Sequence, residues 1–168
     1  EKLKGFVQDS PFVTLFGPSG SGKSSLVRAG LIPELTSAQK WVIAECRPGL
    51  EPFAEIARAL VGGCQRLLND TQQMTETTRL VREFHADVTH ESLGKRIELL
   101  LQQLPETRLL LIIDQFEELY TSSNIMERSP LLDALSKLID CQLNCCILIT
   151  VRGDALDPIV SLSKKSAG

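Results

Sequence analysis

The run from Gly17 to Ser24 constrains this chain more than any other segment. It reads Gly-Pro-Ser-Gly-Ser-Gly-Lys-Ser and fills every fixed position of the pattern G-x-x-x-x-G-K-[ST], the phosphate-binding loop. Glycines let successive backbone N–H groups turn inward around an anion, and a helix that follows presents the positive end of its dipole to the same charge. In this interpretation Lys23 reaches the β- and γ-phosphates of a nucleoside triphosphate, and Ser24 ligates the Mg²⁺ that bridges them. The residues predicted to bind nucleotide here are Gly17, Pro18, Ser19, Gly20, Ser21, Gly22, Lys23, Ser24 and Ser25.

The sequence on both sides of the loop agrees with this interpretation. Residues 12–16 form a short apolar run that suits a buried strand, and residues 25–29 have a helical pattern that we expect Gly30 and Pro33 to stop. Strand, glycine-rich loop and helix is the context that the motif requires. The alternative, a glycine-serine linker that happens to contain Lys-Ser, would have polar flanks on both sides.

Length and composition limit the class of protein. The 168 residues, 43% of them hydrophobic, suit a single domain over 1–168 with a sizeable core. The 18 basic and 21 acidic residues give a net charge of −3, so no bulk charge attracts nucleic acid or an anionic membrane. No apolar run has transmembrane length and no signal segment opens the chain, so we expect a cytoplasmic protein. The first residue, Glu1 rather than Met, favours a piece of a longer polypeptide.

The five cysteines form no C-x-x-C pair, and the two histidines are five residues apart rather than four. Neither spacing is that of a zinc or redox motif, so we expect the cysteines to pack in the core.

The rest of the chain alternates strands with helices. Further strands are predicted at 41–46, 109–113 and 145–151, and helices at 52–68, 92–104 and 131–139. Residues 69–78 are polar and rich in threonine, so we expect a surface connection there. Continuous apolar strands separated by helices indicate an α/β fold with a parallel sheet that is covered on both faces.

A second group of chemically active residues follows the strand at 109–113. Asp114 lies where a carboxylate of phosphate-loop enzymes holds Mg²⁺, so Ser24 and Asp114 are the predicted metal residues. Glu117 and Glu118 follow closely, and either could act as the base that orients an attacking water. The alternative is a helix start that carries acids to suit its dipole.

A third group ends the strand at 145–151. Because the carboxyl ends of parallel strands line the ligand crevice, Thr150 and Arg152 are expected to point toward the nucleotide. There Arg152 could contact the γ-phosphate. Spacing alone equally allows an arginine that pairs with a surface acid.

Taken together, the blocks GPSGSGKSSLVRAGLIPEL, RPGLEPFAEIARAL, LLLIIDQFEELYT and ILITVRGD resemble the NTPase core of the STAND class of signal-transduction ATPases, in particular its bacterial branch that is often joined to WD-repeat or other repeat domains. The resemblance implies a three-layer P-loop NTPase fold with a mainly parallel sheet, in which the sensor strand lies between the phosphate-loop strand and the Walker B strand. It also implies an ATP/ADP-dependent switch that self-associates when a sensor or repeat domain of the same polypeptide meets its trigger. In that class Lys23 and Ser24 would be the phosphate-loop residues, Asp114 the magnesium aspartate, Glu117 or Glu118 the catalytic acid and Arg152 the sensor arginine.

Two other functions stay open at this point. A nucleotide-binding scaffold would need no catalytic acid, and a small-molecule kinase would need a basic lid, for which the segment after Arg152 offers only Lys164 and Lys165. Related cores continue into a further strand, a helical lid and a winged helix, so the chain resembles a truncated core and hydrolysis by it alone is an open question. No N-K-x-D guanine-reading motif is present in the sequence, which favours ATP over GTP.

Overall fold

The apolar strands assemble into one parallel sheet. In the computed structural model, which describes residues 2–37, 40–64 and 68–153, the sheet strands are β1 (Phe12–Gly17), β2 (Trp41–Cys46), β3 (Arg108–Ile113) and β4 (Cys145–Arg152). Within this part of the chain the four strands have the order β1-β4-β3-β2, and all neighbours are parallel. The predicted placement of the Arg152 strand, between the phosphate-loop strand and the Asp114 strand, is therefore confirmed.

The two central strands explain why the sequence shows continuous apolar runs. Side chains of β3 and β4 alternate between the faces of the sheet, and both faces are buried. Leu109 and Leu111 belong to the larger core cluster, whereas Leu110 and Ile112 belong to the smaller one on the opposite face.

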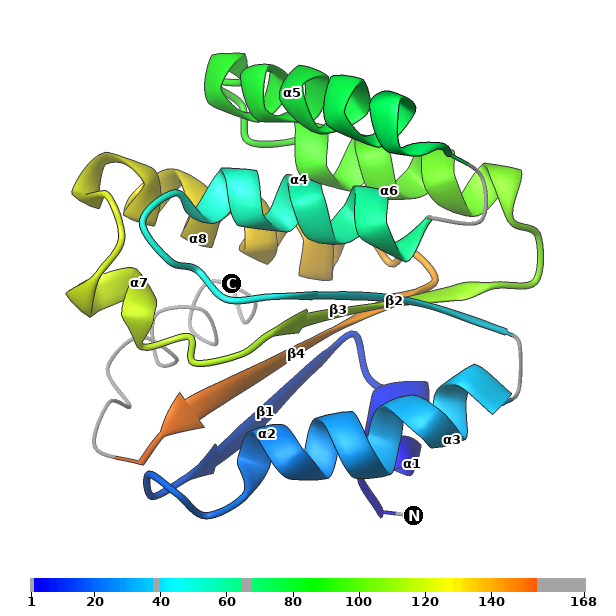
Figure 1. Cartoon of the computed structure of the whole chain (residues 1–168), viewed down its shortest axis with the longest axis vertical. Coiled ribbons are helices and arrows are strands. Elements are labelled where there is room, and N and C mark those ends of the chain that lie inside the picture. The colour runs from blue at the N-terminus through cyan, green and yellow to red at the C-terminus, as the bar shows by residue number, and fades with distance from the viewer. Residues whose placement is uncertain (1, 38–39, 65–67, 154–168) are drawn as a thin grey trace.

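Helices cover both faces and form three layers with the sheet (Figure 1). One face carries α1 (Lys2–Asp9) and the helix that follows the glycine loop; the other carries α4 (Pro52–Gly63), α6 (Ser92–Gln103) and α8 (Ile125–Asp140). The short α7 (Glu118–Thr121) lies near the carboxyl ends of β3 and β4. The α/β fold class is therefore confirmed.

The helix after the loop is longer than its sequence predicts. It runs through α2 (Lys23–Ser25), a π-helical segment η1 (Leu26–Leu31) and α3 (Ile32–Ser37), so the predicted stop at Gly30 and Pro33 is wrong. Gly30 lies inside the wider π turn, where the N–H of Ile32 bonds the carbonyl of Val27. Pro33, which has no N–H to donate, directly follows this π turn and does not end the helix.

The polar segment at 69–78 is also not a connection but part of a helix, α5 (Asp70–Ala86). A reciprocal capping box starts it: Gln72 N donates to Asn69 Oδ1 and Asn69 N donates to Gln72 Oε1, both at 2.9 Å. Leu80 and Phe84, one turn apart, bury its inner face. In Figure 1, α5 is the helix farthest from the sheet, which explains why most of its residues are polar.

The helices predicted at 52–68 and 131–139 have different bounds in the structure. Helix α4 ends at Gly63, and residues 65–67 lie outside the described part of the chain. Helix α8 begins at Ile125, because the side chain of Asn124 accepts a hydrogen bond of 3.1 Å from Met126 N and caps it.

Four of the five cysteines are buried as expected, but Cys141 is exposed at the end of α8. Within the described residues, no helix has both the length and the apolar character needed to span a bilayer.

Candidate functional site

The glycine-rich loop has the backbone that its sequence predicts. Gly20 has a φ of +77° and Gly22 a φ of +84°, both in the left-handed region that side chains other than glycine rarely adopt. Among the residues that the structure describes, none apart from the chain neighbours has a heavy atom within 4 Å of an added Cβ at either position. Glycine is thus required there by the backbone conformation rather than by lack of space.

The ammonium group of Lys23 folds back over this loop. Its Nζ donates hydrogen bonds to the carbonyls of Gly17 and Pro18, at 2.8 and 3.0 Å. The cation is therefore held at the mouth of the loop by two neutral acceptors, which an anion could displace.

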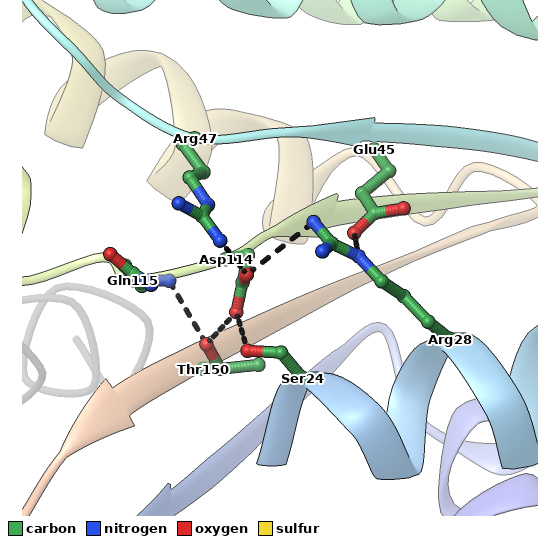
Figure 2. A network of polar contacts seen from close by, with 7 residues as sticks. All are labelled: Ser24, Arg28, Glu45, Arg47, Asp114, Gln115 and Thr150. Carbon is green, nitrogen blue, oxygen red and sulfur yellow. Dashed lines mark hydrogen bonds and ion pairs between the residues drawn. The ribbon is translucent and has the colours of Figure 1, made fainter. Parts of the chain in front are cut away.

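Ser24 and Asp114 meet although 90 residues separate them in the sequence. Ser24 Oγ donates to Asp114 Oδ1 at 2.7 Å. Asp114 follows β3 directly and is only 1% exposed. The predicted metal pair is thus brought together at the carboxyl edge of the sheet, as Figure 2 shows.

Thr150 joins the same carboxylate from β4. Its Oγ1 donates to Asp114 Oδ1 at 2.6 Å and accepts from the backbone N–H of Gln115 at 2.9 Å. We predicted from the sequence that Thr150 would point toward the nucleotide, but not that it would contact Asp114.

Two arginines approach the other carboxylate oxygen. Arg47 Nη2 lies 3.4 Å and Arg28 Nη2 3.7 Å from Asp114 Oδ2 (Figure 2). Arg28 Nε also forms a close ion pair of 2.6 Å with Glu45. Sequence reasoning missed Arg28, Glu45 and Arg47, because they come from the π-helical segment and from the end of β2, and no local spacing links them to Asp114.

These neighbours keep Asp114 ionised. Burial alone would raise the pKa of its carboxyl group, but the hydrogen bonds from Thr150 and Ser24, together with the charges of Arg47 and Arg28, outweigh burial and lower the pKa below its usual value. The site therefore holds a carboxylate at neutral pH.

The residues present fit a magnesium ion. Ser24 Oγ and the carboxylate of Asp114 are hard oxygen ligands that already lie side by side. In addition, Asp114 Oδ2 is buried and accepts no hydrogen bond from the described residues, although Arg47 and Arg28 pair with it by charge.

A cavity of about 520 Å³ opens in front of these groups. Its lining comes from the glycine-rich loop and the helix after it, from the segment between β3 and the end of α7, and from the end of β4. The lining residues are Ser19, Gly20, Gly22, Lys23, Ser24, Ser25, Gln115, Glu117, Glu118, Thr121, Ser122, Thr150 and Arg152. The structure thus brings both predicted acids and the predicted sensor arginine to the phosphate-binding loop.

The two acids differ in their surroundings. Glu117 Oε2 accepts a hydrogen bond of 3.3 Å from the backbone N–H of Arg152. Glu118 begins α7, where a carboxylate also suits the helix dipole. Lys164 and Lys165 lie outside the described residues.

Comparison with known proteins agrees with this geometry. The family model described as Novel STAND NTPase 1 matches residues 1–167. The chain belongs to this family. Membership makes it a nucleotide-binding module of the P-loop NTPase class, whose members bind nucleotide and usually Mg²⁺. No curated protein matches the chain significantly.

Two solved structures are similar in fold. One chain of the E. coli MS115-1 HORMA:CdnC:Trip13 complex matches with a TM-score of 0.52 and 16% identity, over 95% of this chain and 47% of that one. The Aeropyrum pernix ORC2 protein, solved as ADPNP-ADP complexes, matches with a TM-score of 0.50 and 14% identity, over 98% of this chain and 40% of that one. The chain therefore spans less than half the length of either structure.

Proposed function

We propose that this chain is the ATP-binding and ATP-hydrolysing core of a signal-transduction switch, in which the bound nucleotide controls self-association or the output of an attached domain. The observation that carries the proposal is the contact between Ser24 and Asp114. It joins the phosphate-binding loop to the carboxylate after β3, and Ser24 itself lines the cavity described above. Family membership supports the same class of protein.

In this proposal the loop binds the triphosphate. The backbone N–H groups at the end of the loop, those of residues 22–24, face the phosphates, and Lys23 exchanges its two carbonyl partners for phosphate oxygens. Ser24 and Asp114 hold Mg²⁺, which when bound neutralises phosphate charge and orients the β- and γ-phosphates.

Hydrolysis needs a carboxylate that positions water. Water attacks the γ-phosphorus, the bond to the β,γ-bridging oxygen breaks, ADP leaves, and Glu117 or Glu118 takes the proton of the water. We favour Glu117 for two reasons. In the related cores that this chain resembles, the second acid follows the magnesium aspartate by three residues, as Glu117 follows Asp114. In addition, the N–H of Arg152 donates to its carboxylate and orients the side chain. In a scaffold that only binds nucleotide, neither acid would need to position water or accept its proton.

The proposal is tested by calorimetric titration with ATP under two conditions, one containing Mg²⁺ and the other EDTA. Wild-type protein should bind ATP more tightly with Mg²⁺, and Lys23→Ala should lose roughly tenfold to hundredfold in affinity in both conditions, as expected for charge-assisted hydrogen bonds. Asp114→Asn should lose mainly the part of the affinity that depends on Mg²⁺.

Lys95→Ala is the matched control, because Lys95 is an exposed residue of α6 that pairs with Glu91. It should bind ATP as the wild type does. Equal affinity of Lys23→Ala and the wild type would remove the phosphate-loop assignment.

A further inference from the structure

Thr150 contacts three consecutive residues of the turn after β3. Its hydroxyl donates to Asp114 Oδ1 and accepts from Gln115 N, and its backbone carbonyl accepts from Phe116 N at 2.9 Å. The side chain is only 1% exposed. Both hydrogen-bonding capacities of the hydroxyl are thus used in a buried place, and an apolar side chain of the same shape could supply neither.

The turn that Thr150 holds is a strained one. Gln115 has a φ of +57°, although it carries a side chain. A residue other than glycine adopts this conformation only at a steric cost, so surrounding contacts must fix it. The hydrogen bond from Gln115 N to Thr150 is one such contact, and Phe116, fully buried in the core, anchors the turn on its other side.

The carboxylate of Asp114 lies between opposing groups (Figure 2). The hydroxyls of Ser24 and Thr150 donate to Oδ1, whereas the guanidinium groups of Arg28 and Arg47 attract Oδ2 from 3.7 and 3.4 Å. Without the Thr150 hydroxyl, the carboxylate could rotate toward the two cations and away from Ser24. Thr150 therefore opposes the pull of the arginines.

We propose that Thr150 is a positioning residue that holds Asp114 against Ser24 and thereby sets how strongly nucleotide affinity depends on Mg²⁺. This inference rests on the proposed function, because it concerns the same magnesium site. Thr150 acts through Asp114 and through the turn that it fixes.

The test is the ratio of ATP affinities measured with Mg²⁺ and with EDTA. Thr150→Val should lower the affinity with Mg²⁺ by about tenfold, the size expected for one hydrogen bond to a charged group, and should leave the affinity in EDTA within about twofold. Thr150→Ser keeps the hydroxyl and should restore the ratio. A general packing defect would instead reduce both affinities together.

Thr75→Val is the control for the exchange itself, since Thr75 is an exposed residue of α5 whose hydroxyl donates to the carbonyl of Thr71 in its own helix. It should leave the ratio unchanged. Thr150→Ala is a second variant without a hydroxyl, and the ratio is read on whichever of the two variants keeps the thermal unfolding transition.

Two results would overturn the inference while the proposed function stands. In the first, variants without the hydroxyl have the same ratio of ATP affinities, with Mg²⁺ over with EDTA, as the wild type. In the second, this ratio is as low in Thr150→Ser as in Thr150→Val. A wild-type protein that binds no ATP, or binds it equally with and without Mg²⁺, would instead overturn the proposed function, and the Thr150 inference with it.

Discussion

The backbone N–H of Arg152 and the carboxylate of Glu117 form a hydrogen bond of 3.3 Å. Together with the contacts of Thr150 to residues 114–116, it ties the end of β4 to the whole turn from Asp114 to Glu117. The proposed sensor and the proposed catalytic acid are therefore neighbours in one hydrogen-bonded unit, and a shift of one should move the other.

The acid is identified by a pair of isosteric variants. Glu117→Gln keeps an acceptor for the N–H of Arg152 but removes the base, so it should bind ATP normally and hydrolyse it at least about a hundredfold more slowly. Glu118→Gln should keep most of its activity. Phosphate release should be measured in this chain and in any longer polypeptide that contains it; if Glu118→Gln is the inactive variant, the assignment is reversed.

Arg152 should distinguish ATP from ADP. A guanidinium that contacts the γ-phosphate has no such partner in ADP, so Arg152→Ala should lose about tenfold to hundredfold in affinity for a non-hydrolysable ATP analogue and much less for ADP. Arg58→Ala, on the exposed side of α4, serves as the control. Equal losses for the two nucleotides would make Arg152 a general phosphate or structural contact.

Arg47 should weaken the proposed magnesium site. Its guanidinium lies 3.4 Å from Asp114 Oδ2, so its charge repels a divalent cation at that carboxylate. Arg47→Gln should therefore lower the Mg²⁺ concentration that half-saturates ATP binding by severalfold, whereas Arg58→Gln, with the same change of charge, should not. A loss of ATP affinity in EDTA would show that Arg47 contacts the nucleotide instead.

Asp87 should make stability depend on pH. Its carboxylate accepts from Thr89 N, from the Thr89 hydroxyl and from Ser92 N at 2.9, 2.6 and 2.6 Å. Burial alone would raise the pKa of Asp87, but these hydrogen bonds hold it well below its usual value. Because the pKa is lower in the folded state, the stabilisation is complete above the unfolded pKa of about 3.9 and is lost as the pH falls below it.

Asp87→Ala should lower the free energy of unfolding by about 1 kcal/mol at pH 7, the size typical of a side chain that accepts from an N–H at the start of a helix, as Asp87 does from Ser92 N. The difference should shrink below about pH 4. Urea unfolding at both pH values measures it. Asp9→Asn, at the exposed end of α1, is the control; a difference that stays constant with pH would contradict the role of the Asp87 charge.

Sequence patterns predicted most of the sheet, and they singled out most of the residues that the structure brings together in the candidate site. Apolar runs are sufficient to find strands that are buried on both faces, and β3 and β4 are such strands. The motif at 17–24 and the position of Asp114 directly after β3 then placed the loop and the carboxylate at the same edge. Short motifs worked here because strand ends fix where the following residues lie.

Helix α5 and the two arginines near Asp114 were not predicted from the sequence. Helix α5 is rich in threonine, but Asn69 and Gln72 have capping-box spacing, and Leu80 and Phe84 lie four residues apart. These weak local signals could have revealed the helix. By contrast, the approach of Arg28 and Arg47 to Asp114 arises only from packing between distant segments, so no pattern along the chain could predict it.

The left-handed backbone at Gln115 sets thermal stability against precise placement of the neighbouring Asp114. A glycine there would remove the steric cost, but it would also let the backbone explore conformations that a side chain forbids. The glutamine narrows those choices in the unfolded chain, and the folded chain then bears the strain beside Asp114. Selecting variants of position 115 for thermal stability alone would therefore favour glycine, and the backbone next to Asp114 would become less rigid.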